Sequence, residues 1–274
     1  MTLREALARA AAQGLARIDA QLLLLHVLGR VGTERGWLVA HDDEALAPAA
    51  EAAYADLCSR RNAGEPLAYL TGEKEFFGLP LQVDARVLVP RPDTETIVEW
   101  ALELLRPLRA PRVIDLGTGS GAIALAIQRA RPDARVEAVD RSAEALAVAR
   151  ANAQRLQLPV QFRQADWLAG AGRYDLVVSN PPYVRAQDEH LAALRHEPLS
   201  ALVAGEDGLA DLRAIVGAAP AHLAPGGWLL LEHGWDQAAA VEALLAAAGF
   251  TRLSNRKDLG GIVRCSGGQA PELG

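Results

Sequence analysis

Four consecutive residues, Asn180, Pro181, Pro182 and Tyr183, form the segment of this chain whose chemistry is easiest to define. The side-chain carbonyl of Asn180 and the backbone carbonyl of Pro181 are two acceptors for the two hydrogens of one NH2 group. Both prolines lack an N–H donor and fix φ, so the loop is stiff and rich in acceptors. Such a grip stabilises the positive charge that grows on a planar nitrogen when it attacks a methyl group. The ring of Tyr183 can lie on the flat face of the target.

The same tetrapeptide is also compatible with a proline-rich turn that performs no chemistry. It follows the apolar run 174–179, which has the length and composition of a buried strand. The functional interpretation predicts that Asn180, Pro181 and Tyr183 are catalytic. It also predicts that all four residues, including Pro182, bind the substrate.

A glycine-rich turn is the second motif. Residues 112–116 predict a buried strand, and Ala122–Ala130 predicts a helix. Between them the spacing is Gly-x-Gly-x-Gly, which differs from the dinucleotide pattern Gly-x-Gly-x-x-Gly. Glycines at the start of a helix allow a ligand to approach the backbone closely. We therefore predict a ligand-binding loop made of Gly117, Thr118, Gly119, Ser120 and Gly121.

Two further strand-like runs end in residues that suit a nucleoside. The run 135–139 ends at Asp140, whose carboxylate could accept hydrogen bonds from both ribose hydroxyls. The run 160–165 ends at Asp166 and Trp167, an acceptor and a flat ring that suit an adenine. Either acid alone would more often be a solvated turn residue or a helix cap. Their position at successive strand ends, in step with the glycine turn, favours one nucleoside site.

With these motifs the chain resembles the S-adenosylmethionine-dependent methyltransferases of the doubly wound class. Within that class it looks like the glutamine-N5 methyltransferases that modify bacterial peptide-chain release factors. The resemblance covers nearly the whole chain, and Val184 is a mild departure, because isoleucine is expected there. Outside the two motifs it rests on 65–72, 75–78, 89–95, 197–198, 207–209 and 225–234.

The resemblance implies S-adenosyl-L-methionine as the cofactor, held by the glycine turn, Asp140, Asp166, Trp167 and Asn180. It implies direct methyl transfer to the side-chain amide nitrogen of the glutamine in the Gly-Gly-Gln loop of class I release factors. These release factors are then the protein partners, and the helical N-terminal region is the expected docking surface. That region could instead be a cap that only shields the site. We expect a monomer.

Two other functions remain open at this point. A nucleic-acid methyltransferase of the N6-adenine type would use the same Asn-Pro-Pro-Tyr loop on a flipped base. A formal net charge of −6, shared evenly by the parts before and after residue 80, weighs against a basic nucleic-acid-binding module. A non-catalytic nucleotide-binding protein would keep the glycines and Asp140 but would not need Asn180 and Tyr183.

Composition limits the class of protein and the cellular compartment that we expect. A chain of 274 residues with 50% hydrophobic content can bury a substantial core. Cys58 and Cys265 form neither a disulfide framework nor a zinc pattern, so we expect no metal and a reducing cytoplasm. His26 lies in an apolar helical run, where core packing is expected. No long apolar stretch predicts a membrane span, and the N-terminus lacks the form of a signal peptide.

The chain is expected to have three parts. Residues 1–72 show helical spacing and predict a small helical domain for substrate docking, and 73–92 predict a β-hairpin linker. Residues 93–274 predict the cofactor-binding methyltransferase domain, which begins with a helix that Asp93 or Thr94 can cap. From residue 111 strands and helices alternate as in a doubly wound α/β sheet with a parallel core. Residues 250–265 are expected to add an antiparallel edge pair.

Overall fold

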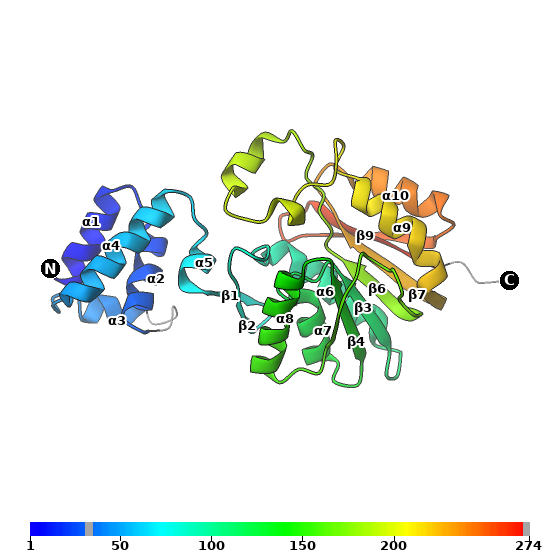
Figure 1. Cartoon of the computed structure of the whole chain (residues 1–274), viewed down its shortest axis with the longest axis horizontal. Helices are drawn as coiled ribbons and strands as arrows, with labels where there is room; N and C mark the ends of the chain where they lie inside the picture. The colour runs from blue at the N-terminus through cyan, green and yellow to red at the C-terminus, as the bar shows by residue number, and fades with distance from the viewer. Residues whose placement is uncertain (31–34, 271–274) are drawn as a thin grey trace. The chain divides into compact units, whose positions relative to one another are not determined.

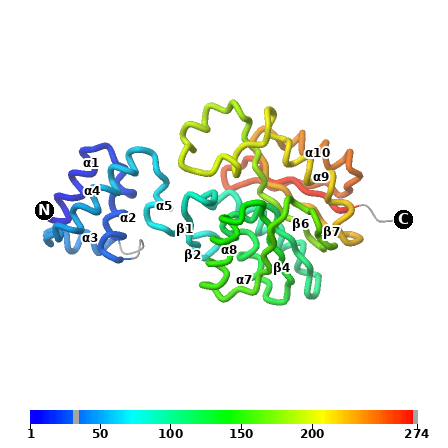
Figure 2. The backbone as a smooth tube through the Cα atoms, viewed as in Figure 1, coloured from blue at the N-terminus to red at the C-terminus, as the bar shows by residue number. Residues whose placement is uncertain are grey.

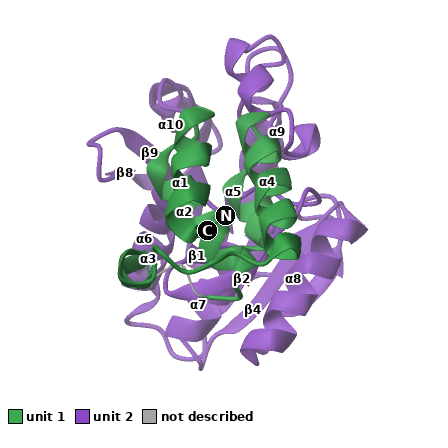
Figure 3. Ribbon diagram, turned by 90° about the vertical axis from the view of Figure 1, so that its left-hand side faces the viewer, with its two compact units in different colours: residues 1–73 green, residues 74–274 purple. Residues whose placement is uncertain are grey.

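The computed structural model describes residues 1–30 and 35–270. The chain divides into two compact units, Met1–Glu73 and Lys74–Gly274, which are coloured separately in Figure 3. The predicted end of the catalytic domain at residue 274 lies outside the described residues. Within the described ranges no helix is long and apolar enough to cross a membrane.

The first unit is helical, as its spacing predicts. Thr2 and Glu5 form a capping box at the start of its first helix, where the Glu5 N–H donates to the Thr2 hydroxyl over 3.2 Å. Leu23, Leu24 and Leu25 are fully buried in its core, but His26 is exposed. The prediction of a core position for His26 is wrong, because the three leucines before it already occupy the inward side of their helix. The helices are α1 (Leu3–Ala12), α2 (Arg17–Val27), α3 (Arg35–Ala40), α4 (Pro48–Asn62) and α5 (Leu67–Thr71).

The predicted hairpin is shorter than its sequence pattern suggests. It consists of β1 (Glu73–Phe76) and β2 (Leu79–Gln82), joined by a tight turn in which Phe77 and Gly78 both have positive φ. Pairing ends at Gln82. The alternating Val83, Val87 and Val89 are buried without forming a strand, so their alternation reflects one-sided burial of a loop.

The second unit contains one sheet of seven strands in the order β5-β4-β3-β6-β7-β9-β8. The first five strands in this order are parallel, and β9 is antiparallel to both β7 and β8. This confirms the predicted doubly wound fold with its antiparallel edge pair. Figure 2 traces the path of the backbone. The strands are β3 (Arg112–Leu116), β4 (Arg135–Asp140), β5 (Gln161–Gln164), β6 (Tyr174–Ser179), β7 (Leu223–Glu232), β8 (Thr251–Lys257) and β9 (Val263–Gln269).

Helices cover both faces of this sheet (Figure 1). One core cluster joins residues of α6 (Glu95–Leu105), α7 (Ala122–Ala130) and α8 (Ala143–Leu156) to one face of the strands. The other cluster joins α9 (Ala210–His222) and α10 (Ala238–Ala247) to the opposite face. The chain winds outward in both directions from β3 and β6, so their carboxyl ends form the switch point where such sheets bind ligands. Short 3-10 turns are η2 (Pro92–Thr94), η3 (Glu189–Leu194) and η4 (Leu199–Ala201).

Candidate active site

A cavity of about 320 Å³ lies at this switch point. The loops that follow β3, β4, β5 and β6 all contribute to its wall. The structure therefore brings the strand-end residues singled out from the sequence together in one place. Those that line the cavity are Gly117, Thr118, Gly119, Ser120, Asp140, Asp166, Trp167, Asn180 and Pro182.

The glycine turn follows β3 directly and needs its glycines for two reasons. Gly117, Gly119 and Gly121 have φ of 69°, 56° and 86°, a region that other residues rarely adopt. A Cβ on Gly117 would lie 3.3 Å from the ring of Trp167, so this glycine also allows the ring to approach the backbone. Trp167 therefore stands over the turn at the wall of the cavity.

Gly121 does not line the cavity and instead packs the turn against two helices. A Cβ at this position would lie 3.0 Å from Leu125 Cδ1 and 3.3 Å from Ala149 Cβ. Its N–H donates to the carbonyl of Thr118 over 2.8 Å. Close packing and a positive φ account for this third glycine, and its contact with the cofactor stays a prediction.

Asp140 at the end of β4 is held in place by two backbone donors. Its Oδ2 accepts the N–H of Gly119 over 3.0 Å, and its Oδ1 accepts the N–H of Ser142 over 2.9 Å. Each carboxylate oxygen can accept a second hydrogen bond, so the group still fits a pair of ribose hydroxyls. Asp166 is exposed beside it and Trp167 is partly buried. These residues fit the nucleoside part of S-adenosylmethionine.

Asp115 lies behind the glycine turn and is almost fully buried. Its Oδ2 accepts the Thr118 hydroxyl over 2.6 Å and the Ala124 N–H over 3.2 Å, whereas its Oδ1 has no partner in the part of the chain that the structure describes. Burial, with a smaller contribution from the charge of Asp140, raises the pKa of Asp115 to about 7. Asp115 is not among the site residues predicted from the sequence, although an acid inside an apolar strand before a glycine turn is a usable signal.

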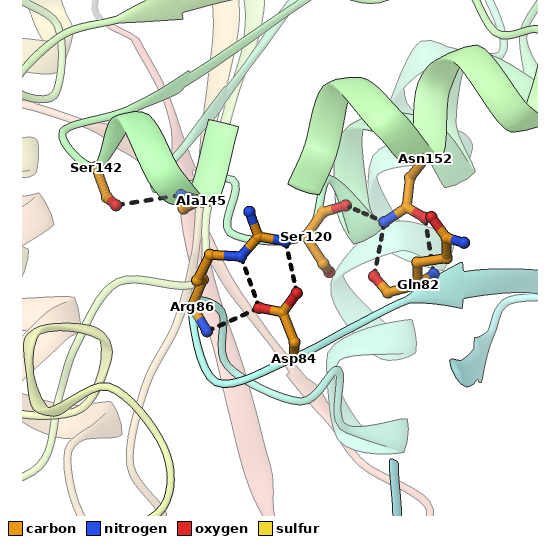
Figure 4. Close-up of polar contacts among 7 residues, drawn as sticks. All are labelled: Gln82, Asp84, Arg86, Ser120, Ser142, Ala145 and Asn152. Atoms are coloured by element: carbon orange, nitrogen blue, oxygen red, sulfur yellow. Dashed lines mark hydrogen bonds and ion pairs between the residues drawn. The ribbon is translucent and has the colours of Figure 1, made fainter. Parts of the chain in front are cut away.

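Part of the cavity wall is a loop, 83–91, which was predicted to belong to the hairpin. Asn152 of α8 joins the end of β2 to the glycine turn: its Nδ2 donates to the carbonyls of Gln82 (2.9 Å) and Ser120 (3.0 Å). Its Oδ1 accepts the Gln82 N–H over 2.7 Å, and Asp84 pairs with Arg86 just beyond (Figure 4). The loop residues that line the cavity are Ala85, Arg86, Val87, Leu88, Pro90 and Arg91.

A second segment, which contains η4, closes the same side of the cavity. Glu197 is buried, accepts the Val89 N–H over 3.1 Å and forms an ion pair with Arg91. Arg141 donates to the carbonyl of Ser200 over 3.0 Å. Glu197 thus ties the 83–91 loop to the segment that brings Pro198, Ser200 and Ala201 to the wall.

The Asn-Pro-Pro-Tyr loop follows β6, which ends where the hydroxyl of Ser179 donates to the carbonyl of Leu116 over 2.7 Å. Asn180 and Pro182 face the cavity. Pro181 is buried and Tyr183 is partly buried against the core under α9, and neither is among the described residues that line the cavity. Burial raises the pKa of Tyr183 above its usual range, which keeps its hydroxyl protonated.

Thr94 takes a different role from the one expected. It stands at the start of α6, but neither its side chain nor that of Asp93 caps the helix. The Thr94 hydroxyl instead accepts a hydrogen bond from Asn180 Nδ2 over 3.2 Å. Glu232, at the end of β7, is a second buried group beside Asn180 to which the sequence analysis assigned no role. No group of His, Cys, Asp or Glu among the described residues could hold a metal ion.

Family models match two segments of the chain. The methyltransferase small domain matches residues 98–201, which include the glycine turn, Asp140 and Asn180. The PrmC N-terminal domain matches residues 2–72, which lie in the helical unit.

Curated relatives match over nearly the full length. The chain is 53% identical over 260 residues to the "Release factor glutamine methyltransferase" of Bordetella pertussis, covering 93% of this chain and 95% of that protein. It is 46% identical over 258 residues to the protein of the same name from Salmonella typhimurium, covering 92% of each.

Solved structures share the fold at low sequence identity. A methyltransferase from Pyrococcus furiosus is 17% identical with a TM-score of 0.54, covering 78% of this chain and 98% of that one. The 16S rRNA N2 G1207 methyltransferase from T. thermophilus, in complex with AdoMet and guanosine, is 21% identical with a TM-score of 0.56. That match covers 73% of this chain and 50% of the other. Both similarities confirm the predicted fold class.

Proposed function

This chain belongs to the release factor glutamine methyltransferases, and we propose that its substrate is the glutamine of the Gly-Gly-Gln loop in class I release factors. The chain is therefore an S-adenosylmethionine-dependent methyltransferase, as its resemblance to that class implies. In the proposed reaction it transfers the methyl group of the cofactor to the side-chain amide nitrogen, N5, of that glutamine.

One observation carries this proposal: Asn180 lines the same cavity as the glycine turn and Asp140. A nucleoside held by Asp140 and an amide held by Asn180 would therefore occupy one continuous space. Methyl transfer requires this proximity, because donor and acceptor must lie in line within contact distance.

In this proposal each half of the cavity holds one reactant. Asp140 accepts the ribose hydroxyls, and Asp166 and Trp167 contact the adenine. The Asn180 side-chain oxygen accepts one N–H bond of the glutamine amide. The backbone carbonyl of Pro181, which lies in sequence between the cavity-lining Asn180 and Pro182, accepts the other. The ring of Tyr183 packs partly on the core and supports this loop, and its stacking on the substrate stays a prediction.

The cofactor supplies an electrophilic methyl group on a positively charged sulfur. The chain then needs no nucleophile of its own, and its contribution is to position the amide and to stabilise the charge that develops on nitrogen. A strong base is also unnecessary, because a methylated, positively charged amide loses its proton readily. This explains why no histidine or cysteine lines the described part of the cavity.

The helical unit, residues 1–72, is on this proposal the docking surface for the release factor. The net charge of −6 supports a protein substrate over a nucleic acid, so the N6-adenine alternative is not favoured. A substrate that acts in translation termination, together with two free buried cysteines, supports a cytoplasmic enzyme, and we propose that it acts as a monomer.

Mass spectrometry tests the proposal directly. Purified release factor is incubated with the enzyme and isotopically labelled S-adenosylmethionine, digested and sequenced. We expect one labelled methyl group on the glutamine of the Gly-Gly-Gln peptide. Label on adenine in an added oligonucleotide, with none on the release factor, would favour the nucleic-acid alternative.

A further inference from the structure

Glu232 is a buried carboxyl group that has no part in the reaction as described so far. It is 2% exposed, and its Oε2 has no hydrogen-bond partner among the described residues. It is not among the described residues that line the cavity. Burial of a charge without full compensation is energetically costly, so a carboxylate in such a place is a candidate for a functional residue.

The sheet register places Glu232 beside the Asn-Pro-Pro-Tyr loop. Ser179 of β6 pairs with Leu231 of β7, so Asn180 and Glu232 follow at neighbouring strand ends. The side chains of Thr94 and Asn180 both interact with the Glu232 carboxyl group, and Asn180 Nδ2 also donates to Thr94 Oγ1 over 3.2 Å. Asn180 and Thr94 line the cavity and Glu232 does not, so the three side chains form one connected polar group that leads from the cavity into the core.

We infer that Glu232 is a positioning residue: its carboxylate, acting through Thr94 and directly on Asn180, turns the Asn180 carbonyl oxygen toward the substrate amide. The inference deepens the proposed function of this site and rests on it. Glu232 does not touch the substrate in this arrangement.

The direction of the hydrogen bonds follows from the chemistry of each group. An ionised carboxylate can only accept, so the Thr94 hydroxyl donates to it, and Thr94 Oγ1 is then free to accept from Asn180 Nδ2. The Asn180 oxygen is left facing the cavity. A protonated Glu232 can donate a hydrogen bond. The hydrogen bonds from Glu232 through Thr94 to Asn180 can then reverse their direction, and the Asn180 NH2 faces the substrate NH2. Two donors would then face each other and the grip would be lost.

The surroundings of Glu232 favour a change of charge near neutral pH. Burial is the largest cause that raises its pKa to about 7, Asp93 of η2 adds to the rise, and Arg264 of β9 opposes it. Burial raises the pKa values of Tyr183 and Cys265 and lowers that of His233, so these neighbours stay neutral in this range. The active, ionised form of Glu232 should thus form as pH rises through about 7.

The test is single-turnover methylation of a purified release factor at saturating S-adenosylmethionine from about pH 6 to about pH 8. In the wild-type protein the rate should rise roughly tenfold over this range, following ionisation of one group. Glu232→Gln should be roughly 10- to 30-fold slower at the upper end and nearly independent of pH, with unchanged cofactor affinity. It should also be no less stable than wild type at that pH, because it removes a buried charge.

Thr94 provides an independent test of the hydrogen bonds that link Glu232 to Asn180. Thr94→Val removes the hydroxyl at constant shape and should lose most of the rate that Glu232→Gln loses. Thr94→Ser restores the hydroxyl and should stay within about threefold of wild type. The double variant Glu232→Gln with Thr94→Val should be no slower than the slower single variant, since both act through one path.

The matched control is Glu137→Gln. Glu137 lies on β4, where it pairs with Arg163 and accepts the Tyr174 hydroxyl, and it does not line the cavity. This variant should keep the wild-type rate and pH profile.

The possible outcomes separate the inference from the function on which it rests. A Glu232→Gln protein with the wild-type rate and pH profile overturns the inference and leaves the proposed function standing. If Glu232→Gln does not fold, equal rates for Thr94→Val and Thr94→Ser overturn it instead. Failure of the wild-type enzyme to methylate any release factor overturns both.

Discussion

Two buried carboxyl groups lie behind the two halves of the cavity, and they act on different kinds of neighbour. Asp115, behind the cofactor half, accepts hydrogen bonds from the Thr118 hydroxyl and the backbone N–H of Ala124. Glu232, behind the target half, interacts with the side chains of Thr94 and Asn180. Burial raises the pKa of each to about 7, and each has one oxygen without a partner.

The difference shows how the two halves are built. In the proposed cofactor half, Asp115 supports the backbone of the glycine turn from behind, and Asp140, Asp166 and Trp167 add their side chains. The proposed target half contains the amide side chain of Asn180, which can present either its oxygen or its NH2 group to the cavity, so neighbouring groups must fix its orientation. A change behind the cofactor half should therefore alter cofactor affinity, and a change behind the target half should alter the rate of transfer.

The largest effect is expected for Asn180→Ala. The rate of methyl transfer should fall by roughly 10²–10³ or more, because a preorganised acceptor for the developing charge is lost. Cofactor affinity should change little, since Asp140 and the glycine turn are untouched. Single-turnover methylation at saturating cofactor, with calorimetric titration of the cofactor, measures both quantities. A wild-type rate would contradict the role of this loop in gripping the amide.

Asn180→Asp should cause a partial loss that lies between those of Asn180→Ala and Tyr183→Phe. It keeps an acceptor of nearly the same shape, but it sets a second carboxylate beside Glu232, and two neighbouring carboxylates cannot both ionise easily. The same assay ranks the three variants, and any other order would call for a different account of the target half.

The next largest effect is expected for Asp140→Ala, in the cofactor half. Loss of a charged hydrogen-bond partner should cost about 1.5–3 kcal/mol, or on the order of 10- to 100-fold in affinity for S-adenosylmethionine. The rate at saturating cofactor should fall much less, because the ribose contacts persist from ground state to transition state. Calorimetric titration measures the dissociation constant, and an unchanged value rules out Asp140 as the ribose ligand.

Asp115→Asn should weaken cofactor binding by roughly three- to tenfold, because the glycine turn loses part of its support. The rate at saturating cofactor should stay within about twofold of wild type. If the rate falls while affinity is kept, the proposed contrast between the two halves is wrong.

The same variant has a stability consequence that depends on pH. The folded protein raises the pKa of Asp115 to about 7, so it binds this proton more tightly than the unfolded chain does. The resulting stabilisation is complete at low pH and is lost as pH rises through about 7. In urea unfolding, the free energy of unfolding of Asp115→Asn should therefore rise relative to that of the wild type from about pH 5 to about pH 8. Parallel pH profiles would refute the raised pKa.

A smaller effect is expected for Tyr183→Phe. The ring packs against the core and the change removes only the hydroxyl, so the rate should fall by no more than about two- to fivefold. Single-turnover methylation measures it. A loss as large as that of Asn180→Ala would place the hydroxyl itself in the target half.

The smallest effect on affinity is expected for Trp167→Phe, which keeps a flat ring beside Gly117. Cofactor binding should change by no more than about threefold. Addition of cofactor should quench tryptophan fluorescence in the native protein, and the variant should lose most of this quench. An equal quench in a folded variant would mean that Trp167 does not contact the cofactor.

The amino-acid sequence by itself determined the order of the elements and the chemistry at their ends. Alternation of apolar strands and helices predicts the parallel sheet, and α7 spans Ala122–Ala130 in the structure as it does in the prediction. Asp140 ends one parallel strand and Asn180 follows another. Because the carboxyl ends of parallel strands lie at one edge of the sheet, the two residues come together although they are far apart in sequence. Local patterns of this kind are readable since each depends on a few neighbouring residues.

Only the tertiary structure decided which residues support that chemistry from behind. Val87 and Val89 alternate like strand residues, yet no partner strand lies beside them, and they hold a loop over the cavity. Thr94 has the residue type and position of a helix cap, but its hydroxyl meets Asn180. Glu232 gains its neighbours from the register of β6 with β7. Strand order and register arise from packing of the whole sheet, so no local pattern contains them.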